Sequence, residues 1–459
     1  MKAIVQSLVL ILITAFSAQA SFVKQPYLQN LTDSSIVLYW EVFSAQPGTV
    51  QYGLTTDYGS VINDPNPNTS HELVLPNLFE DTVYHYRVVS GSDTSIDARF
   101  HTRVGQFKPF RFIAYGDNRS DSAAHQSVVD QMQLVSPLPG LMVNVGDLTN
   151  SGSSTDYQTF FNIERNMMNR VPLYPVLGNH DISNMTNWFS YFVLPNNERW
   201  YSTRYGNAVF IGLDDNSSYS PGSAQYNWLL SELQADSADP SVWHIFIINH
   251  QPPYTTNTGH ASNMTIRQYL CPLFERFHVS IVFNGHNHCY EHSLVNGVHY
   301  IITGGGGAPL HNSWGPTQPW TIYREATFEF VLVDVRTDTV HCRGIKPGGI
   351  VIDSFAIIGA HPGVAEIDTG KINSTLMLEA IPNPFADKVH FHFVLQKSTW
   401  TTLSIYDASG KKVANLLSNL MSAGDQDVLW NRSTLPDGFY IAILKAGETT
   451  NVLRLSAMR

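Results

Sequence analysis

The sequence predicts a multi-domain protein with an N-terminal β-sandwich, a central α/β domain and a small C-terminal β-sandwich. Three observations support this fold class. The chain has 459 residues and is therefore too long for one ordinary domain. Hydrophobic residues make up 43% of it, which is enough to fill several buried cores. Short alternating segments at both ends flank a middle region in which apolar runs alternate with helical stretches.

Residues 1–20 have the pattern of a secretory signal peptide. Lys2 provides the positive end, and Leu8–Phe16 is an apolar stretch too short to span a bilayer. The small residues of Ala18-Gln19-Ala20 form a cleavage motif. A membrane anchor is the alternative interpretation. We expect the segment to be removed and the mature chain to be exported with no membrane span.

Residues 22–104 are predicted to form the N-terminal β-sandwich. Apolar and polar residues alternate most clearly in Ser35–Trp40, Gly48–Tyr52 and Thr82–Val88. Polar turns such as Asn63–Pro67 separate these segments, a spacing that is typical of antiparallel sandwiches. Since no ionisable residues cluster in this region, we expect a structural or substrate-flanking module.

Residues 108–360 have the rhythm of an α/β domain. Strands are expected at Phe112–Tyr115, Leu141–Val145 and Ile245–Ile248, and a helix at Ser122–Val135. Apolar strands separated by helices are typical of a sheet with both faces covered. In such domains ligands bind at the carboxyl ends of the strands.

Five of the apolar segments are followed closely by residues that can bind a metal ion. Each of these residues lies next to or near a Gly or Pro turn. The set is Asp117, Asp147, Asn179, His250, and the pair His286 and His288. Taken singly, each motif is weak, because a Gly-Asp after a strand is most often a turn or a helix cap. The His-x-His pair is stronger, since alternate residues beyond a strand can present two imidazoles to neighbouring metals. As an ordered set of hard and borderline ligands, they indicate a metal site.

The same motifs carry a family resemblance. They resemble the calcineurin-like metallophosphoesterases, and within them the purple acid phosphatases, through Gly116-Asp117, Gly146-Asp147, Gly178-Asn179-His180, His250, Gly285-His286-Asn287-His288 and Tyr290-Glu291. Val50–Gly53 and Tyr84–Val88 are similar to the fibronectin-III-like domain that precedes their catalytic domain. The resemblance implies that residues 108–360 form a four-layer metallophosphoesterase β-sandwich flanked by helices.

The resemblance also implies a centre of two metal ions, of iron, zinc or manganese. One ion would be held by Asp117 and His288, the other by Asn179, His250 and His286, with Asp147 bridging both. Two such ions bind a hydroxide and clamp the attacking and phosphoryl oxygens for in-line displacement.

Two further histidines receive catalytic roles from the resemblance. His180 would contact the phosphoryl group or the leaving oxygen. His260 would bind substrate or protonate the leaving group, a role that suits an imidazole with a pKa near neutrality. A solvent-exposed loop position is the alternative for His260.

Two positions depart from the family pattern at the first ion, the one assigned to Asp117 and His288. The tyrosine ligand of purple acid phosphatases is Asn150 here, and the histidine that many superfamily members carry after the first Asp is Arg119. Asn150 would ligate through its amide oxygen or orient water. Arg119 would bind the substrate phosphate through its planar fork or pair with Asp121. We therefore expect a colourless enzyme whose first site does not depend on ferric iron.

Other residues near these motifs are assigned to packing. Gly304–Gly307 lacks the Lys and Ser/Thr of a nucleotide-binding loop, so we expect a close-approach turn near the metal site. Cys289 and His125 are expected to pack, while His292 is given either packing or support of the ligands. The three cysteines allow at most one disulfide, whose pairing the sequence leaves open.

Residues 372–459 are predicted to form the small C-terminal β-sandwich. Pro382-Asn383-Pro384-Phe385, Ile405-Tyr406-Asp407 and Gly438-Phe439-Tyr440 follow in an order that resembles the C-terminal sorting domain of the type IX secretion system. The resemblance implies that the chain passes through the periplasm to the outer-membrane surface or the medium, with the type IX machinery as partner. An adhesive or spacer domain is the alternative.

These observations favour a secreted metal-dependent phosphoesterase, most consistent with an acid phosphatase-like phosphomonoesterase that uses a hydroxide activated by two metal ions. A phosphodiesterase or nucleotide-directed hydrolase, and a non-catalytic surface binding protein on the same scaffold, are the alternatives. The complete ligand set favours an enzyme. The net charge of -11 argues against a nucleic-acid binding surface, because a phosphate backbone demands a basic face. Metal ions reverse the local field, so an anionic phosphate ester can still bind.

Overall fold

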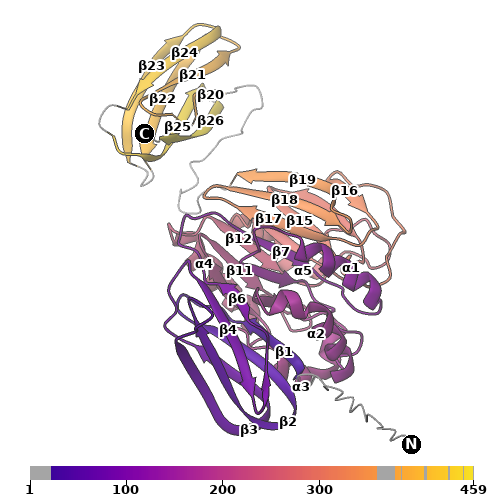
Figure 1. The fold of residues 1–459 in the computed structure, drawn as a ribbon. Coiled ribbons are helices and arrows are strands. Elements are labelled where there is room, and N and C mark those ends of the chain that lie inside the picture. Colours follow the sequence, from indigo (N-terminus) through magenta and orange to yellow (C-terminus); the bar gives the residue numbers. More distant parts are fainter. Residues whose placement is uncertain are drawn as a thin grey trace, which may run out of the picture. The chain divides into compact units, whose positions relative to one another are not determined.

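The computed structural model describes residues 22–358 and 378–457, apart from 384, 408–410, 433–434 and 448. The expected signal peptide, and Pro384 of the C-terminal motif, lie outside the described residues. The chain divides into two compact units, residues 1–363 and 364–459 (Figure 1). No helix in the described ranges is both long enough and apolar enough to cross a membrane.

The N-terminal strands form one connected antiparallel sheet of six strands. They are β1 (Phe22–Gln29), β2 (Ile36–Gly53), β3 (Ser60–Leu75), β4 (Val83–Ser90), β5 (Asp93–Thr94) and β6 (Ala98–His101). The long strand β2 pairs with β1, β3 and β4. Along β4 every second side chain is buried, including Tyr84, Tyr86 and Val88. This region is β-rich, as the alternation of its sequence predicts.

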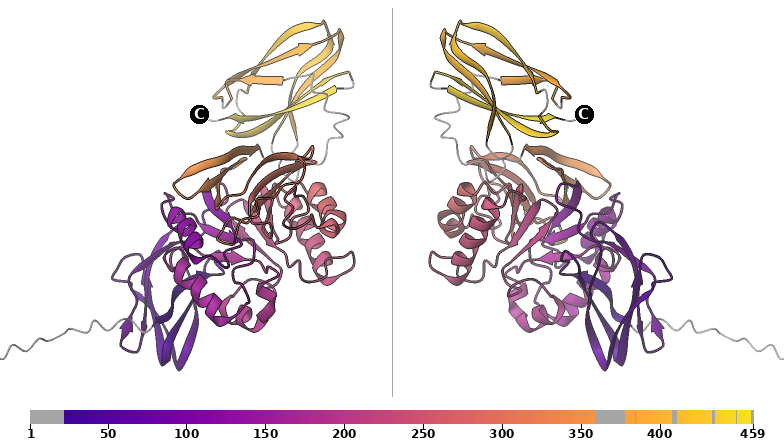
Figure 2. Two further views of the ribbon diagram at one scale, coloured as in Figure 1. Left: turned by 90° about the vertical axis from the view of Figure 1, so that its right-hand side faces the viewer. Right: turned by 90° about the vertical axis from the view of Figure 1, so that its left-hand side faces the viewer.

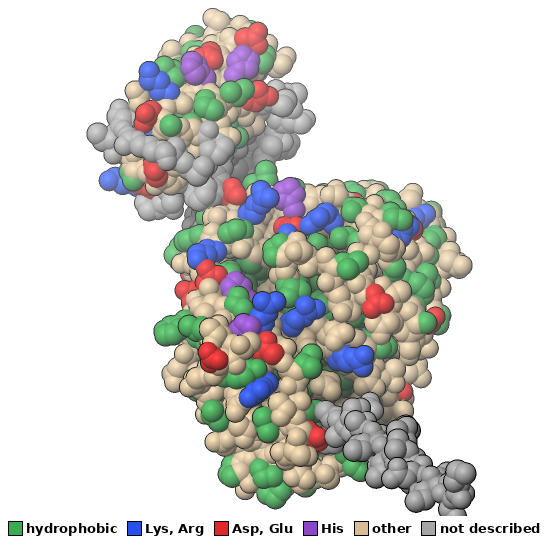
Figure 3. All heavy atoms as spheres, in the orientation of Figure 1, with side chains coloured by type: hydrophobic (Ala, Val, Ile, Leu, Met, Phe, Trp, Pro, Cys, Tyr) green, Lys and Arg blue, Asp and Glu red, His purple; other side chains and the backbone are tan. Residues whose placement is uncertain are grey.

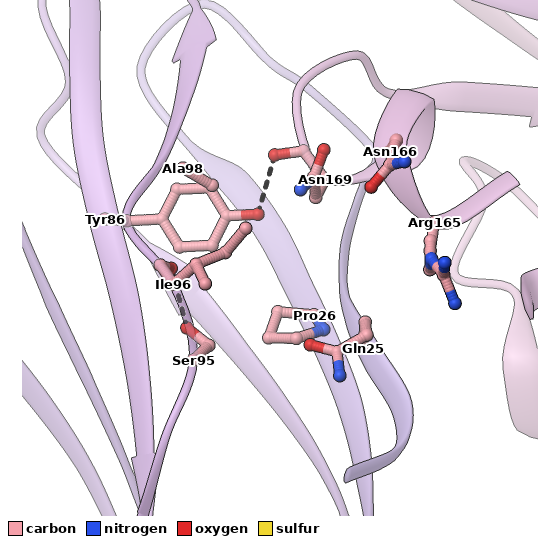
Figure 4. Close-up of a pocket in the computed structure, with 9 residues that line it drawn as sticks. All are labelled: Gln25, Pro26, Tyr86, Ser95, Ile96, Ala98, Arg165, Asn166 and Asn169. Atoms are coloured by element: carbon pink, nitrogen blue, oxygen red, sulfur yellow. Dashed lines mark hydrogen bonds between the residues drawn. The ribbon is translucent and has the colours of Figure 1, made fainter. Parts of the chain in front are cut away.

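The N-terminal sheet is bonded to the central region, with which it shares one compact unit. The Tyr27 hydroxyl donates to the Tyr191 carbonyl at 2.6 Å, and the Tyr86 hydroxyl donates to the Asn169 carbonyl at 2.8 Å. A hollow of about 200 Å³ lies at this joint, between Pro26 and Ile96 on one side and Arg165 on the other (Figure 4). None of the expected metal ligands lines this hollow, so it is separate from the expected metal site.

Two mixed sheets form the centre of the molecule. The first has the order β19-β18-β17-β7-β8-β9, with the bounds β7 (Phe110–Tyr115), β8 (Leu141–Asn144), β9 (Leu173–Pro175), β17 (Phe330–Val335), β18 (Thr339–Lys346) and β19 (Ile350–Ile358). The second has the order β10-β11-β12-β13-β15-β14-β16, with the bounds β10 (Tyr201–Tyr205), β11 (Ala208–Gly212), β12 (His244–Ile248), β13 (Ile281–Asn284), β14 (Tyr290–Val295), β15 (Val298–Thr303) and β16 (Thr321–Glu325). Parallel pairing joins β7, β8 and β9 in one sheet and β11, β12, β13 and β15 in the other.

The two sheets pack face to face through aromatic side chains. The ring of Phe112 on β7 lies 4.9 Å from that of Phe210, 5.0 Å from Phe246 and 5.8 Å from Phe283, all on the second sheet. Rings at these separations and inclined angles give close, favourable packing.

Helices cover the outer faces of both sheets. The core of the first sheet includes side chains of α1 (Ser122–Gln133) and α2 (Ser154–Met168). A separate core packs α4 (Ala224–Ala238), α5 (Met264–Tyr269) and α6 (Cys271–Arg276) against the second sheet. Figure 2 shows the two helix groups on opposite sides of the sheets. A short helix α3 (Met185–Tyr191) and the 3₁₀ turn η1 (Asp181–Asn184) follow β9.

All three cysteines are buried free thiols. The one disulfide that their number allows therefore does not form. Cys289 is fully buried next to a candidate ligand, as its assignment to packing predicts.

The C-terminal unit contains two antiparallel sheets. One consists of β20 (Leu378–Ile381), β21 (Lys388–Leu395) and β24 (Gly424–Asn431), and the other has the order β23 (Lys412–Met421), β22 (Thr399–Asp407), β25 (Gly438–Ala446) and β26 (Thr449–Ala457). Val389, Phe391 and Phe393 alternate with exposed residues along β21 and share one core with Leu403 and Ile405 of β22. This region is β-rich, as its alternation predicts.

Candidate metal centre

The carboxyl ends of parallel strands from both sheets meet at one edge. β7, β8 and β9 end there in the first sheet, and β12 and β13 end there in the second. The two edges are in contact, because the His286 amide donates to Asp117 Oδ2 at 2.9 Å and His250 Nδ1 donates to the Val145 carbonyl at 2.8 Å. The topology thus brings together the expected ligands that follow the five strands.

Three of these residues have left-handed backbone conformations. Asp117, Asp147 and His286 have φ angles of 55°, 55° and 67°. Such angles cost a non-glycine residue about 1–3 kcal/mol and persist only where the surroundings enforce them, which happens most often at functional sites. Here the Asp117 amide donates to the Gly146 carbonyl at 2.9 Å, and the Asn118 amide donates to the Asp147 carbonyl at 3.0 Å.

A glycine and a buried carboxylate hold the Asp147 turn in place. A Cβ on Gly178 would lie 2.1 Å from Asp147 Oδ1, so only glycine fits there. Asp181 accepts from the amides of Gly178 at 3.0 Å, Thr149 at 3.1 Å and Leu148 at 3.3 Å. Burial and the nearby Asp147 raise the pKa of Asp181 to about 7. The sequence reasoning gave Asp181 no role, although it stands in the Gly-Asn-His-Asp motif.

Asp147, Asn179, His250 and His286 form one group, called the second site below. His250 Nε2 lies 3.1 Å from Asn179 Oδ1, 3.2 Å from His286 Nδ1 and 3.5 Å from Asp147 Oδ1. Ligand atoms about 3.0–3.4 Å apart are what bond lengths of about 2.0–2.1 Å to one metal ion require. These spacings therefore suit a single ion at the centre of the group.

The hydrogen bonds of His250 also fit a cation at the second site. Its Nδ1 donates to the Val145 carbonyl, so Nε2 of the neutral ring carries a lone pair. That lone pair faces Asn179 Oδ1 and Asp147 Oδ1, both of which are acceptors. Acceptors facing one another in a buried place repel, and a cation between them removes the repulsion.

Asp117, Asp147 and His288 form the first site. His288 Nε2 lies 3.6 Å from Asp117 Oδ1, and ligand atoms of Asp117, Asp147 and His250 all lie within 4.8 Å of one another. His288 Nδ1 donates to the Pro309 carbonyl at 2.7 Å, which leaves Nε2 with its lone pair toward the site. The residues of both sites thus fit metal ions, and they share Asp147.

Burial keeps the candidate imidazole ligands neutral. It lowers the pKa of His286 from 6.5 to about 2, with His250 and His260 adding to the effect, and that of His288 to about 3. Burial also lowers the pKa of His250, against the opposing effect of Asp147. Neutral imidazole is the form of histidine that binds metal.

The two carboxylates respond to burial differently. Burial and the neighbouring Asp147 raise the pKa of Asp117 well above its usual value. Burial opposes ionisation of Asp147 too, but His250, the His180 amide and Arg119 together hold its pKa below the ordinary value. Asp147 is therefore ionised, and its negative charge is available to both sites.

Arg119 and Asn150, the two departures from the family pattern, both lie at the first site. Arg119 Nε donates to Asp147 Oδ2 at 3.1 Å, and Asn150 Oδ1 lies 3.5 Å from Arg119 Nη1. Asn150 Oδ1 also accepts from the Ser120 hydroxyl at 3.2 Å. Asp121 instead caps α1, where it accepts from the amides of Ala123 and Ala124. The pairing of Arg119 with Asp121, one of the two expectations, is therefore not formed.

The two candidate catalytic histidines both border the cluster. His180 Nε2 lies 3.9 Å from Asp147 Oδ2, and His180 Nδ1 donates to the Asn150 carbonyl at 2.8 Å. The half-buried ring of His260 stacks on His286, with ring centroids 3.8 Å apart. Asn287 fixes that loop, since it accepts from the His260 amide at 2.8 Å and donates to the His260 carbonyl at 2.9 Å.

His311 joins this group, and the sequence reasoning missed it. Its ring stacks on His288 with centroids 4.0 Å apart and lies 5.3 Å from the ring of His260. The His311 amide donates to the His288 carbonyl at 2.9 Å. His311 follows no strand directly and belongs to no motif, so no local pattern points to it. The neighbouring run Gly304–Gly307 was the only indirect signal.

Gly304–Gly307 is a close-approach turn at the site, as predicted. A Cβ on Gly304 would lie 2.8 Å from Asp117 Oδ2, and the Gly306 amide donates to the Gly116 carbonyl at 2.8 Å. His125 is buried against Glu164, in agreement with its assignment to packing. His292 bonds to Asp353 and His299 rather than to a ligand.

A hollow of about 370 Å³ opens beside the first site. Arg119, Ser120 and Asn150 line it, together with Phe160 and Ile163 of α2. Its lining is mostly polar, with hydroxyl and amide groups that can bind a polar molecule.

The chain matches two known families. Residues 110–290 match the family described as calcineurin-like phosphoesterase, and residues 379–456 match the secretion system C-terminal sorting domain. The second match marks the chain for export to the cell surface or the medium.

Curated relatives include purple acid phosphatases of plants. Purple acid phosphatase 15 of Arabidopsis thaliana is 27% identical over 293 residues, which are 52% of this chain and 53% of that protein. The Fe(3+)-Zn(2+) purple acid phosphatase 12 of the same plant is 24% identical over 369 residues, 68% of this chain and 77% of that protein. Phosphoenolpyruvate phosphatase of Allium cepa is 25% identical over 302 residues, 60% of this chain and 61% of that protein. The chain thus spans between about half and three quarters of the length of these relatives.

Solved structures share the fold. The purple acid phosphatase PPD1 from yellow lupin (Lupinus luteus) seeds has a TM-score of 0.64 at 19% identity, over 72% of this chain and 74% of that one. A structure of PhoD has a TM-score of 0.58 at 13% identity, over 78% of this chain and 94% of that one. The solved structures show the fold, and the two family matches show that the chain carries a calcineurin-like phosphoesterase domain, similar to that of purple acid phosphatases, followed by a secretion system C-terminal sorting domain.

Proposed function

We propose that this exported chain hydrolyses phosphate monoesters with the help of bound metal ions. The observation that carries the proposal is the second site, in which the lone pair of His250 Nε2 faces the oxygens of Asn179 and Asp147. Such an arrangement is unfavourable until a cation enters, so it supports a metal-dependent reaction. The relatives named as phosphatases support the same reaction class.

The proposed ligands are those that the motifs predict. Asp147, Asn179, His250 and His286 would hold one ion, and Asp117, Asp147 and His288 would hold the other. Imidazole and carboxylate ligands suit zinc, iron and manganese. When bound, such ions supply a hydroxide nucleophile at neutral pH and a counter-charge for the phosphoryl oxygens.

Hydrogen-bond donors beside the site support a monoester over a diester. The Arg119 guanidinium and His180 lie near Asp147, and His260 lies against His286. A monoester dianion has three unesterified oxygens for such donors, whereas a diester has two and a single charge. A planar guanidinium fork and the N–H groups of protonated imidazoles bind phosphate oxygens well.

His260 is the proposed proton donor to the leaving oxygen. Its ring is fixed against His286, yet it remains half-exposed and so can reach a substrate. Burial, with the nearby His250, lowers the pKa of His260 from 6.5. A donor with a lowered pKa is protonated mainly in acid, so hydrolysis is expected to be faster below neutral pH. This is the behaviour of an acid phosphatase.

The test uses the full exported chain, loaded with zinc, manganese or iron, and two chromogenic substrates. We expect para-nitrophenyl phosphate to be hydrolysed and bis(para-nitrophenyl) phosphate to be hydrolysed much more slowly. Chelation should abolish turnover, and added metal should restore it. The reverse preference would replace the monoesterase by a diesterase. Metal binding without turnover of either substrate would leave the surface binding protein.

A pair of matched variants tests whether the turnover belongs to this site. His250→Ala removes a candidate ligand, and we expect it to abolish hydrolysis. His341→Ala truncates an exposed histidine on β18 and should leave hydrolysis unchanged. Equal activity of the two variants would place the reaction elsewhere.

A further inference from the structure

The Arg119 guanidinium lies within the first site itself. Its Nε donates to Asp147 Oδ2 at 3.1 Å, and its Nη2 lies 3.4 Å from His288 Nε2. The side chain is only 14% exposed. Arg119 thus contacts two of the three residues that would hold the first ion.

The backbone directs Arg119 to this position. The preceding residue, Asn118, is buried, and its amide donates to the Asp147 carbonyl at 3.0 Å. The Asn118 side chain accepts from Asn144 Nδ2 at 2.6 Å. With Asn118 fixed on both its backbone and its side chain, Arg119 leaves the turn at the edge of the ligand cluster.

Arg119 and a metal ion need the same electron pair. His288 Nδ1 donates to the Pro309 carbonyl, so Nε2 has one lone pair, which accepts either a guanidinium hydrogen or a metal ion. Arg119 has five N–H donors and no acceptor, so it cannot itself be a ligand. An ion at the first site and the observed position of Arg119 are therefore mutually exclusive.

The second site has no such competitor among the described residues. The atoms that face His250 Nε2 are the oxygens of Asn179 and Asp147 and a nitrogen of His286, all of them candidate ligands. Arg119 touches the second site only at Oδ2 of the shared Asp147, and no Lys or Arg hydrogen bond to Asn179, His250 or His286 is found among the described residues. The two sites therefore differ in whether a permanent cation already occupies them.

We propose that Arg119 serves as a built-in cation of the first site and competes with the metal ion there. The centre then holds one divalent ion tightly at the second site, and a further ion enters the first site only when Arg119 moves away. The hollow of about 370 Å³ that Arg119 lines gives its side chain room to do so. Arg119 in place also keeps a positive charge beside the bound ion for a phosphate group.

The inference rests on the proposed function, since it concerns the same metal centre, but its test measures bound metal rather than turnover. Metal-free full-length protein is titrated with Mn²⁺ by calorimetry, and the bound metal is counted after gel filtration. For the natural chain we expect one tight ion and a second that binds weakly. For Arg119→Ala we expect two ions, with the affinity for the second raised about tenfold or more, because residues that contact metal ligands tune metal affinity on this scale.

A matched control and a spectroscopic readout complete the experiment. Arg336→Ala truncates an exposed arginine after β17 and should bind metal like the natural chain. Arg119→Gln keeps a polar side chain without the charge, so it guards against a folding defect in Arg119→Ala. Electron paramagnetic resonance should show an isolated Mn²⁺ ion in the natural chain and a coupled pair in both Arg119 variants.

The outcomes separate this inference from the proposed function. Two ions that bind with equal affinity to the natural chain and to the Arg119 variants would overturn the role of Arg119 and leave the phosphoesterase in place. Absence of tight metal binding in every protein would overturn both. One tight ion in the natural chain, with a second gained on loss of Arg119, would support the inference even if neither chromogenic substrate is hydrolysed.

Discussion

The tight packing of Gly178 against Asp147 predicts that adding a single methyl group there will lower catalysis strongly. In Gly178→Ala the added Cβ would lie 2.1 Å from Asp147 Oδ1 and 2.2 Å from the Asp147 amide nitrogen. Carbon and a polar heavy atom rest at about 3.5 Å, so the two turns must separate by about 1 Å. Asp147 is the proposed ligand of both ions, and the Gly178 amide also donates to Asp181. The substitution therefore displaces the residue on which both sites depend.

The magnitude follows from two separate costs. Overpacking in a rigid region destabilises by about 1–3 kcal/mol, which corresponds to a fall in Tm of only a few degrees for a unit of this size. A displacement of about 1 Å at reacting groups lowers catalysis by about 100-fold. We therefore expect kcat/KM for para-nitrophenyl phosphate to fall about 100-fold in a protein that remains folded.

The measurement pairs steady-state kinetics with thermal unfolding of the metal-loaded protein. Gly105→Ala is the matched control, because its Cβ meets nothing closer than 3.6 Å. It should leave both kcat/KM and Tm unchanged. If Gly178→Ala kept kcat/KM within about twofold of the natural chain, the reasoning from this contact would be refuted.

Three further predictions concern other parts of the centre. His311→Ala removes the ring that stacks on His288 and should lower kcat/KM about tenfold. The control variant His341→Ala should leave kcat/KM unchanged. Equal kinetics of the two variants would exclude His311 from the site. Loaded with Fe³⁺, the natural chain should show no tyrosinate-to-iron absorption band, because Asn150 stands at the tyrosine position. The double variant Arg119→Ala, Asn150→Tyr, which also removes the competing guanidinium, should gain one, and a band in the natural chain would contradict this. Burial raises the pKa of Glu329 from 4.5 to about 8. Between these two pH values the folded state holds a proton that the unfolded state has lost. The free energy of unfolding should therefore fall as pH rises from 4.5 to 8, by up to about 1.4 kcal/mol per pH unit. Glu329→Gln should remove that part of the slope in denaturant titrations between pH 4.5 and 8, and an unchanged slope would argue against the raised pKa.

Much of the candidate site could be predicted because its residues follow a local rule. Asp117, Asp147 and His250 each come directly after an apolar strand, and parallel strands end at the same edge of a sheet. The strand pattern and the adjoining turns are properties of short segments. The same holds for Gly304–Gly307, because four consecutive glycines by themselves indicated a turn whose backbone lies close to neighbouring groups.

Residues that act through distant partners could not be found in this way. Asp181 matters because it bonds to the turns after two different strands, and His311 because a loop without a motif returns to His288. Neither contact leaves a periodic trace in the sequence. The N-terminal strands likewise read as a separate module, but Tyr27 and Tyr86 bond them to the central region.

The sequence by itself predicted the candidate ligands, since ligand type and position after a strand are both written in the local order of residues, and the same motifs carried the resemblance from which the proposed reaction class follows. Only the tertiary structure decided what Arg119 does. Its partner His288 lies 169 positions along the chain, and the two meet because the two sheets pack face to face, which brings the carboxyl ends of their strands together. From the sequence, Arg119 was expected either to bind the substrate phosphate or to pair with Asp121. In the folded chain its guanidinium lies between Asp147 and the lone pair on His288 Nε2.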